Sequence, residues 1–126
     1  MKTIDLEYVT LTFIDDKTVL VEAKYGVEIT GEDCPNTHEI IEKEMSADYG
    51  MIINRKEDYS IAPLQVYNVL NGFKRLKAIA IVNHKARTAI CVETEQKLFR
   101  GQLEDFTTVD AARSWLDDQL AAASVR

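Results

Sequence analysis

The chain has 126 residues, of which 46% are hydrophobic and 29% charged, and its formal net charge is -6. These values are typical of one globular domain, expected to span residues 1–126, and they exclude a disordered or fibrous chain. An acidic chain of this kind is a poor match for the phosphate backbone of nucleic acids, so we expect no nucleic-acid partner. The longest aliphatic run, residues 78–82, is far shorter than the roughly 20 residues that cross a bilayer, so we expect no membrane span. Only two cysteines are present, too few for a disulfide framework, which together with the missing span favours a cytoplasmic location.

The first half of the chain predicts a β-hairpin, a helix and a buried strand. Apolar and polar residues alternate over 9–13 and over 19–25, and the short polar segment 15–17 between them suits a hairpin loop. Thr30 and Asp33 predict a capping box at the start of the helix. Its expected apolar stripe consists of Cys34, Thr37, His38, Ile41 and Met45. The short apolar run 51–53 is typical of a strand covered on both faces.

The second half alternates helices with strands. We expect Ser60 to open a helix that stops at Asn71, a fully buried strand over 78–82, and a third helix over 85–99. A short strand over 103–106 follows, and Thr107 with Asp110 is expected to cap the last helix. The side chains expected to face the core from these helices are Leu64, Tyr67, Leu70 and Phe73, then Ala86, Ala89, Ile90 and Leu98, then Val109, Ala112, Leu116 and Leu120.

This order of elements predicts the fold class. Helices that alternate with strands imply an α/β domain with a mixed, mostly parallel sheet, because right-handed crossovers lay each helix against the sheet. We expect four to five strands, opened by the antiparallel hairpin, together with four helices.

No arrangement of residues characteristic of catalysis or metal binding is present. His38 and His84 lie outside any metal-ligand spacing, and we expect both to be partly exposed. Cys34 and Cys91 lie in apolar stretches, which predict inert buried thiols. We therefore expect no catalytic residue, no metal and no cofactor.

Three segments carry a resemblance to a known family. The strand 77–82 and the later stretch 106–116, with its Phe-Thr-x-x-x-x-Ala-x-x-Trp-Leu pattern, resemble the C-terminal half of small bacterial SpoIIAA-like proteins. Residues 25–30, which lead into a helix, are similar to the beginning of these proteins. They belong to the STAS-like superfamily, so the resemblance implies a SpoIIAA/STAS-like fold and a non-enzymatic function that depends on protein partners.

The resemblance also implies a candidate site after the third expected strand. In anti-sigma-factor antagonists of this superfamily, a serine at the start of the second helix is phosphorylated by a partner kinase. The matching region here places Ser60 at that helix start, with Asp58 and Tyr59 before it and no glycine after it. Ser60, Asp58, Tyr59 and Asn54 are therefore implied as phospho-acceptor or partner contacts. The residues alone leave a second interpretation open for Ser60, which is a plain helix N-cap.

The charge is unevenly distributed along the chain. Residues 1–50 carry a balance of -8, residues 51–101 a balance of +5 and residues 102–126 a balance of -3. The basic segment is either an ordinary solvated surface or a surface that meets an acidic protein partner or a second copy in a homodimer. The candidate residues for this basic surface are Arg55, Lys56, Lys74, Arg75 and Lys77.

Two classes of function follow from these observations. The first is a non-enzymatic regulatory or protein-interaction domain of STAS-like type. The second is a small-molecule or lipid carrier, with a pocket of at least roughly a few hundred Å³ between sheet and helices and the third helix as its lid. An enzyme would need Ser60, a histidine and an acid brought together, which nothing in the sequence indicates.

Overall fold

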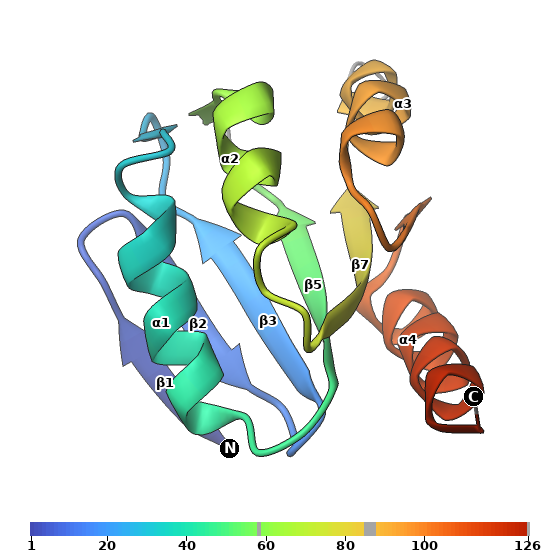
Figure 1. Cartoon of the computed structure of the whole chain (residues 1–126). Coiled ribbons are helices and arrows are strands. Elements are labelled where there is room, and N and C mark those ends of the chain that lie inside the picture. The colour runs from blue at the N-terminus through green and yellow to red at the C-terminus, as the bar shows by residue number, and fades with distance from the viewer. Residues whose placement is uncertain (58, 85–87, 126) are drawn as a thin grey trace.

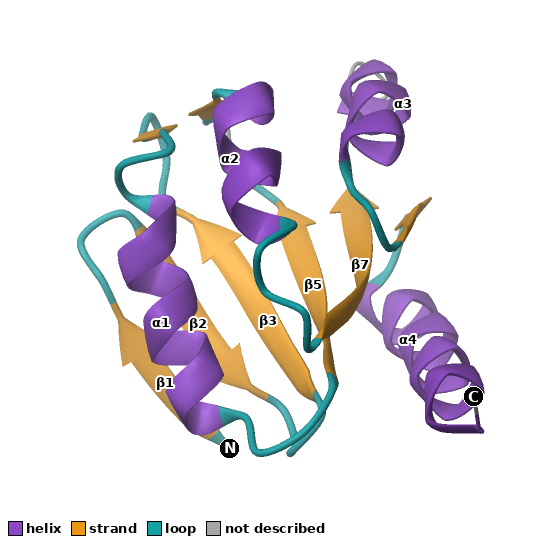
Figure 2. Ribbon diagram, viewed as in Figure 1, coloured by secondary structure: helices purple, strands orange, loops and turns teal. Residues whose placement is uncertain are grey.

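Strands and helices alternate along the chain, and they assemble into a mixed sheet with helices on both faces (Figure 1, Figure 2). The computed structural model describes residues 1–57, 59–84 and 88–125. The strands are β1 (Lys2–Asp5), β2 (Val9–Phe13), β3 (Thr18–Ala23), β4 (Glu28–Ile29), β5 (Tyr49–Arg55), β6 (Ser60–Ile61), β7 (Leu76–Asn83) and β8 (Gln102–Phe106). The helices are α1 (Cys34–Glu44), α2 (Pro63–Leu70), α3 (Thr88–Leu98) and α4 (Val109–Val125). Among the described residues, no helix has the length and apolar character needed to cross a membrane.

The main sheet has the strand order β1-β2-β3-β5-β7-β8. The first three strands pair antiparallel, and the remaining neighbours pair parallel, which confirms the expected hairpin and α/β class. The sheet has six strands where four to five were expected, because the exposed segment Lys2–Asp5 pairs with β2. A separate two-stranded sheet, β4 with β6, was also missed, since two-residue strands carry no periodicity.

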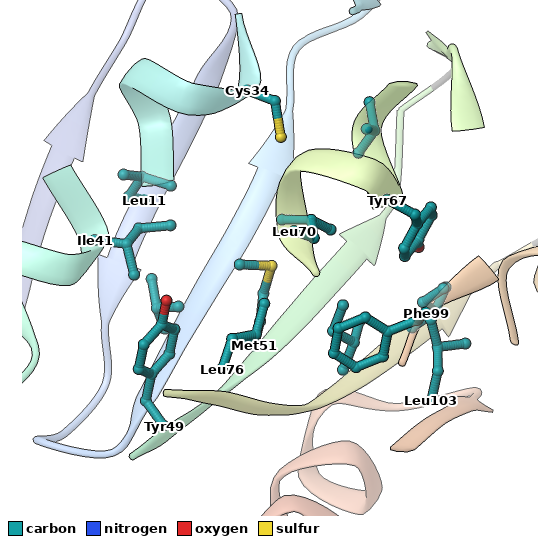
Figure 3. Packing of buried hydrophobic residues seen from close by; sticks show 14 of the residues in the cluster. Leu11, Cys34, Ile41, Tyr49, Met51, Tyr67, Leu70, Leu76, Phe99 and Leu103 are labelled. Atoms are coloured by element: carbon teal, nitrogen blue, oxygen red, sulfur yellow. The ribbon is translucent and has the colours of Figure 1, made fainter. Parts of the chain in front are cut away.

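The core lies on both faces of the sheet. Helices α1 and α2 cover one face together with α3, over a cluster that includes Leu11, Ile41, Met51 and Tyr67 (Figure 3). Helix α4 covers the other face and packs mainly on β5 and β7. The predicted stripe of this helix is confirmed at Ala112, Leu116 and Leu120, which are all buried.

Strand β7 explains why the run 78–82 is apolar without interruption. Ile79 and Ile81 belong to the cluster under α1 and α2, whereas Ala78, Ala80 and Val82 belong to the cluster under α4. All five are fully buried, because a central parallel strand has helices on both faces.

Helix starts were the least accurate of the predicted features. Ser60 does not cap α2: it lies in β6, its N–H donates to the Val27 carbonyl at 3.0 Å, and Ala62 takes the N-cap position without a side-chain bond. Leu64 was expected to face the core, but it is 71% exposed in the first turn of α2. The cap of α4 is Thr108, whose hydroxyl accepts the Ala111 N–H at 3.2 Å, and not Thr107.

The start of α1 also differs from the expected capping box. Asp33 occupies the N-cap position without a side-chain cap, while the Thr30 hydroxyl accepts the Glu32 N–H and donates to the Asp33 carboxylate. The stripe of this helix is confirmed at Cys34, Thr37, His38 and Ile41, which are all buried.

Some sequence-based expectations lie outside the described residues. These are the start of the third helix at Lys85, the inward side chains of Ala86, Ala89 and Ile90, the buried thiol of Cys91, and the contact role of Asp58.

Candidate functional site

The predicted residues Asn54 and Arg55 end β5, and Tyr59 and Ser60 follow it, at the edge of the sheet where the parallel strands β3, β5 and β7 all end. In open α/β sheets this carboxyl edge is where ligands bind. The structure distributes the predicted residues over different faces. Arg55 and Tyr59 turn toward the helices α1–α3, Asn54 lies on the opposite face, and Ser60 is exposed in β6.

A buried ion pair connects β5 to α3. The Arg55 guanidinium pairs with the Glu95 carboxylate, and their side chains are only 7% and 1% exposed. The Arg55 Nε also donates to the Tyr59 hydroxyl at 3.0 Å. Because a buried charge is tolerated only with a partner, this pair ties α3 to the end of β5.

The surroundings of Arg55 favour its charged form. Burial opposes the positive charge of Arg55, but Tyr59 and Glu95 overcome it and hold the pKa of the guanidinium above its ordinary value. Burial and the Glu95 carboxylate raise the pKa of the Tyr67 phenol above its ordinary value. At neutral pH the cluster therefore contains the charged Arg55 guanidinium beside the protonated Tyr67 phenol.

A small apolar pocket lies beside this cluster, between the sheet and helices α1 and α2. Its volume is about 70 Å³. Its walls include Val21 and Ile53 from the sheet, Cys34 and His38 from α1, and Tyr67 from α2. The pocket lies where a carrier was expected to have one, but its volume is well below the few hundred Å³ that this function was expected to require.

His38 is buried in the wall of this pocket, which corrects the expectation of a partly exposed side chain. It is 5% exposed, and its Nδ1 has no hydrogen-bond partner among the residues that the structure describes. The ring packs against Phe73 with a centroid distance of 5.3 Å. Burial lowers the pKa of His38 to about 4, so the ring is neutral at physiological pH.

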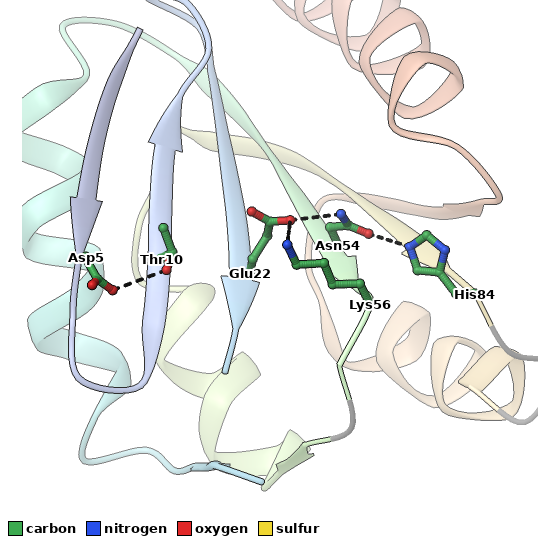
Figure 4. A network of polar contacts seen from close by, with 6 residues as sticks. All are labelled: Asp5, Thr10, Glu22, Asn54, Lys56 and His84. Atoms are coloured by element: carbon green, nitrogen blue, oxygen red, sulfur yellow. Dashed lines mark hydrogen bonds and ion pairs between the residues drawn. The ribbon is translucent and has the colours of Figure 1, made fainter. Parts of the chain in front are cut away.

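The opposite face of the same edge carries a chain of polar contacts (Figure 4). Asn54 donates its amide to Glu22 at 3.0 Å, and its carbonyl oxygen lies 2.7 Å from the Nε2 of His84. Lys56 pairs with the same Glu22 oxygen at 3.1 Å. The expectation of an exposed His84 is confirmed. Ser60 takes no part in this network, so the three groups that an enzyme would need are not brought together among the described residues.

The five candidates for a basic surface divide into two groups. Arg55 and Lys56 are held by Glu95 and Glu22, and Arg75 donates to the carbonyls of Glu42 and Met45 at the end of α1. Lys74 and Lys77 form no ion pair with a described residue.

Sequence reasoning missed Glu95, Tyr67 and Glu22 as parts of this edge. Glu95 lies within a helix among other polar residues, and Tyr67 matched an ordinary core stripe. One usable signal was the alternation within β5, which places Asn54 and Arg55 on opposite faces.

Comparisons with known proteins support the fold. No protein-family model matches the chain, and a search of curated proteins finds no match. Among solved structures, the chain is similar to an uncharacterized protein of the DUF3478 family with a SpoIIAA-like fold from Shewanella loihica PV-4. The two chains share 17% sequence identity at a TM-score of 0.61, over 92% of this chain and 99% of the other. The chain therefore has a SpoIIAA-like fold, as its sequence resemblance implied.

Replacing His38 should change how stability depends on pH. The pKa of His38 is 6.5 in the unfolded chain and about 4 in the folded chain. Between these two pH values the ring binds a proton in the unfolded chain but not in the folded chain. The wild type should therefore lose up to about 3 kcal/mol of stability from this group as the pH falls through that window. Urea unfolding at several pH values should show a shallower dependence for His38→Leu. The matched variant His84→Leu leaves the buried ring intact and should keep the wild-type dependence; equal slopes for both variants would contradict the assignment.

Removing either partner of the buried ion pair should destabilise the protein, and the effects of the two substitutions should not add. Glu95→Leu leaves an unpaired buried guanidinium and should lower the free energy of unfolding by about 3–5 kcal/mol, as should Arg55→Met. The double variant should lose much less than the sum. Lys24→Met, which breaks the exposed pair with Asp5, is the control and should change stability by less than about 1 kcal/mol. Additive losses in urea unfolding would show that the two charges are not coupled.

Proposed function

From its SpoIIAA-like fold, we propose that this protein is a non-enzymatic regulatory domain that acts by binding a protein partner. The proposed contact is the surface around the two-stranded sheet, which we call the β4–β6 surface. It is defined by Tyr25, Glu28, Ser60 and Leu64, and Ser60 is the one member that the sequence predicted as a site residue.

The observation that carries this proposal is the exposure of two large apolar side chains. Tyr25 is 74% and Leu64 is 71% exposed, and they flank the small sheet, before β4 and after β6. Removing a side chain of this size from water is worth about 1.5–3 kcal/mol, which an interface gains when a partner covers it. Exposed Glu28 and Ser60 lie between them and supply the polar rim of an interface.

The backbone of this surface is held in place before any partner binds. Ser60 and Ala62 donate to the carbonyls of Val27 and Ile29, both at 3.0 Å. Gln65 of α2 accepts the Gly31 N–H at 3.1 Å, which ties the start of α2 to the loop after β4. A surface fixed in this way loses little conformational entropy on binding, which favours affinity.

Ser60 is the proposed regulatory position within this surface. It pairs directly with Glu28 across the two parallel strands, and both side chains are exposed. A phosphate on Ser60 would place about two negative charges opposite the Glu28 carboxylate. Like charges in directly opposed strand positions are destabilising, so phosphorylation by a partner kinase would loosen β4 from β6 and weaken the contact.

Site-specific photo-crosslinking tests the proposal. A benzoylphenylalanine residue at position 64 or position 25 should give one discrete adduct with a partner protein in cells, because both side chains would be covered. The same residue at position 117, an exposed position on α4, should give none. Ser60→Glu combined with the residue at position 64 should reduce the adduct, whereas Ser60→Gln should not.

Either of two outcomes would count against the partner surface. One is equal adducts at positions 64 and 117, which would indicate unspecific collisions. The other is no adduct at position 64 or position 25 in a chain whose circular dichroism spectrum matches that of the wild type.

A carrier of a compact apolar molecule is the second candidate, favoured by the pocket beside Arg55 and Glu95. The walls are mainly aliphatic and aromatic, and the buried ion pair lies at one side as a polar anchor. At about 70 Å³ the pocket takes a small group, and a longer chain requires the surrounding helices to separate.

Native mass spectrometry tests the carrier function. Wild-type protein purified without denaturation should carry a bound mass, and Ile53→Phe, which adds volume at the pocket wall, should lose it. Ile14→Phe is the control, because Ile14 is half-buried against the cluster under α4. A wild type that shows only the mass of the chain removes this candidate.

A further inference from the structure

A second hollow lies at the opposite edge of the sheet, where β7 and β8 begin. Its volume is about 280 Å³. It is lined by Lys74, Leu76, Lys77, Phe99, Arg100 and Gly101. Two turns form it, one between α2 and β7 and the other between α3 and β8, and we refer to it as the Lys74–Arg100 hollow.

Three positive charges surround this hollow. Lys74, Lys77 and Arg100 form no ion pair with any described residue, and no acidic residue of the described chain lines the hollow. The arginines at 55, 75 and 113, in contrast, all have acidic partners. Three clustered cations repel one another, and an anion bound among them relieves that repulsion.

The two walls of the hollow are fixed relative to each other. Asn71, at the end of α2, accepts the Arg100 N–H at 2.8 Å and donates to the Leu98 carbonyl at 2.9 Å. At Gly101 a Cβ would lie 2.6 Å from the Lys77 carbonyl oxygen and 2.8 Å from the Phe99 ring, so only glycine fits between the walls. The backbone that forms the hollow is thus fixed by the fold.

A β-bulge lies at the start of β7, next to the hollow. The pairing of β5 with β7 shifts between Tyr49 and Gly50, so that Leu76 and Ala78 oppose consecutive residues and Lys77 is the extra one. Bulges re-aim a side chain out of the regular alternation. Arg75, the neighbouring cation, is instead turned to the end of α1 by its bonds to Glu42 and Met45.

We propose that the Lys74–Arg100 hollow binds a phosphate group. Lysine and arginine are the side chains that bind phosphate most often. The lysine ammonium acts as a point charge, and the arginine guanidinium acts as a planar fork of hydrogen-bond donors. Buried Leu76 and Phe99 form an apolar floor beside these charges, which suits the carbon part of a small phosphate ester. The hollow lies at the edge of the sheet opposite the β4–β6 surface, so its test succeeds or fails independently of the proposed partner binding.

Titration with inorganic phosphate at constant ionic strength tests the proposal, with the amide signal of Gly101 followed by NMR. The wild type should show a saturable shift. Lys77→Gln and Arg100→Gln should each weaken binding about tenfold, because each removes one charge-assisted contact. Lys43→Gln is the matched control: it removes an exposed lysine on α1 without an ion pair to a described residue, and it should leave the affinity unchanged.

Vesicles distinguish the source of the phosphate. The protein is mixed with phosphatidylcholine vesicles that either contain or lack phosphatidic acid. If it sediments only with the vesicles that contain phosphatidic acid, the hollow binds a lipid headgroup. Saturable binding of free phosphate without sedimentation would assign it to a soluble ester.

Three results would overturn the proposal. The first is an absence of saturable binding in both forms. The second is equal phosphate affinity in the wild type and in the variant with all three cations replaced by glutamine. The third is a dimer that forms without phosphate and shifts the Gly101 signal, because a second copy would then fill the hollow.

Discussion

The central strands β5 and β7 are buried on both faces of the sheet. The rest of the structure depends on which side chains these two strands place on each face. Both strands place only large side chains under α1 and α2, whereas under α4 the small residues Gly50, Ala78 and Ala80 alternate with Ile52 and Val82. Gly50, Ala78 and Ala80 let α4 lie close to the sheet, and at Gly50 a Cβ would be only 2.7 Å from Leu116. This close approach brings Leu116 of α4 against the sheet, whereas the larger side chains on the other face line the small pocket.

The buried ion pair is the second constraint, and it follows from the first. Strand alternation turns Arg55 toward the helices immediately after Asn54 has turned away from them. A guanidinium in that position requires a carboxylate, and Glu95 supplies it from α3. Helix α3 is therefore held by this charged pair in addition to the apolar contacts of Val92 and Leu98, whereas the buried side chains of α4 against the sheet are apolar.

The two proposed binding regions use opposite edges of one sheet. The carboxyl edge carries the β4–β6 surface, and the amino edge carries the Lys74–Arg100 hollow. The uneven distribution of charge along the sequence bears on this division. Arg55, Lys56 and Arg75 are engaged in the protein's own structure, and the described cations of the basic segment without an ion pair to a described residue are Lys97 and the three at the hollow.

The amino-acid sequence by itself determined the order of the main elements, because alternation in β2 and β3 and the uninterrupted apolar run in β7 are local consequences of burial. It also determined the α/β class and the SpoIIAA-like resemblance, which depends on packing residues such as Trp115 and Leu116. Only the tertiary structure decided that Ser60 belongs to a strand, since its partner Val27 lies far away in the sequence. The same is true of the pairing of Arg55 with Glu95, 40 positions apart, and of the burial of His38. Contacts of this range leave no trace in local periodicity, because they depend on which faces the whole sheet brings together.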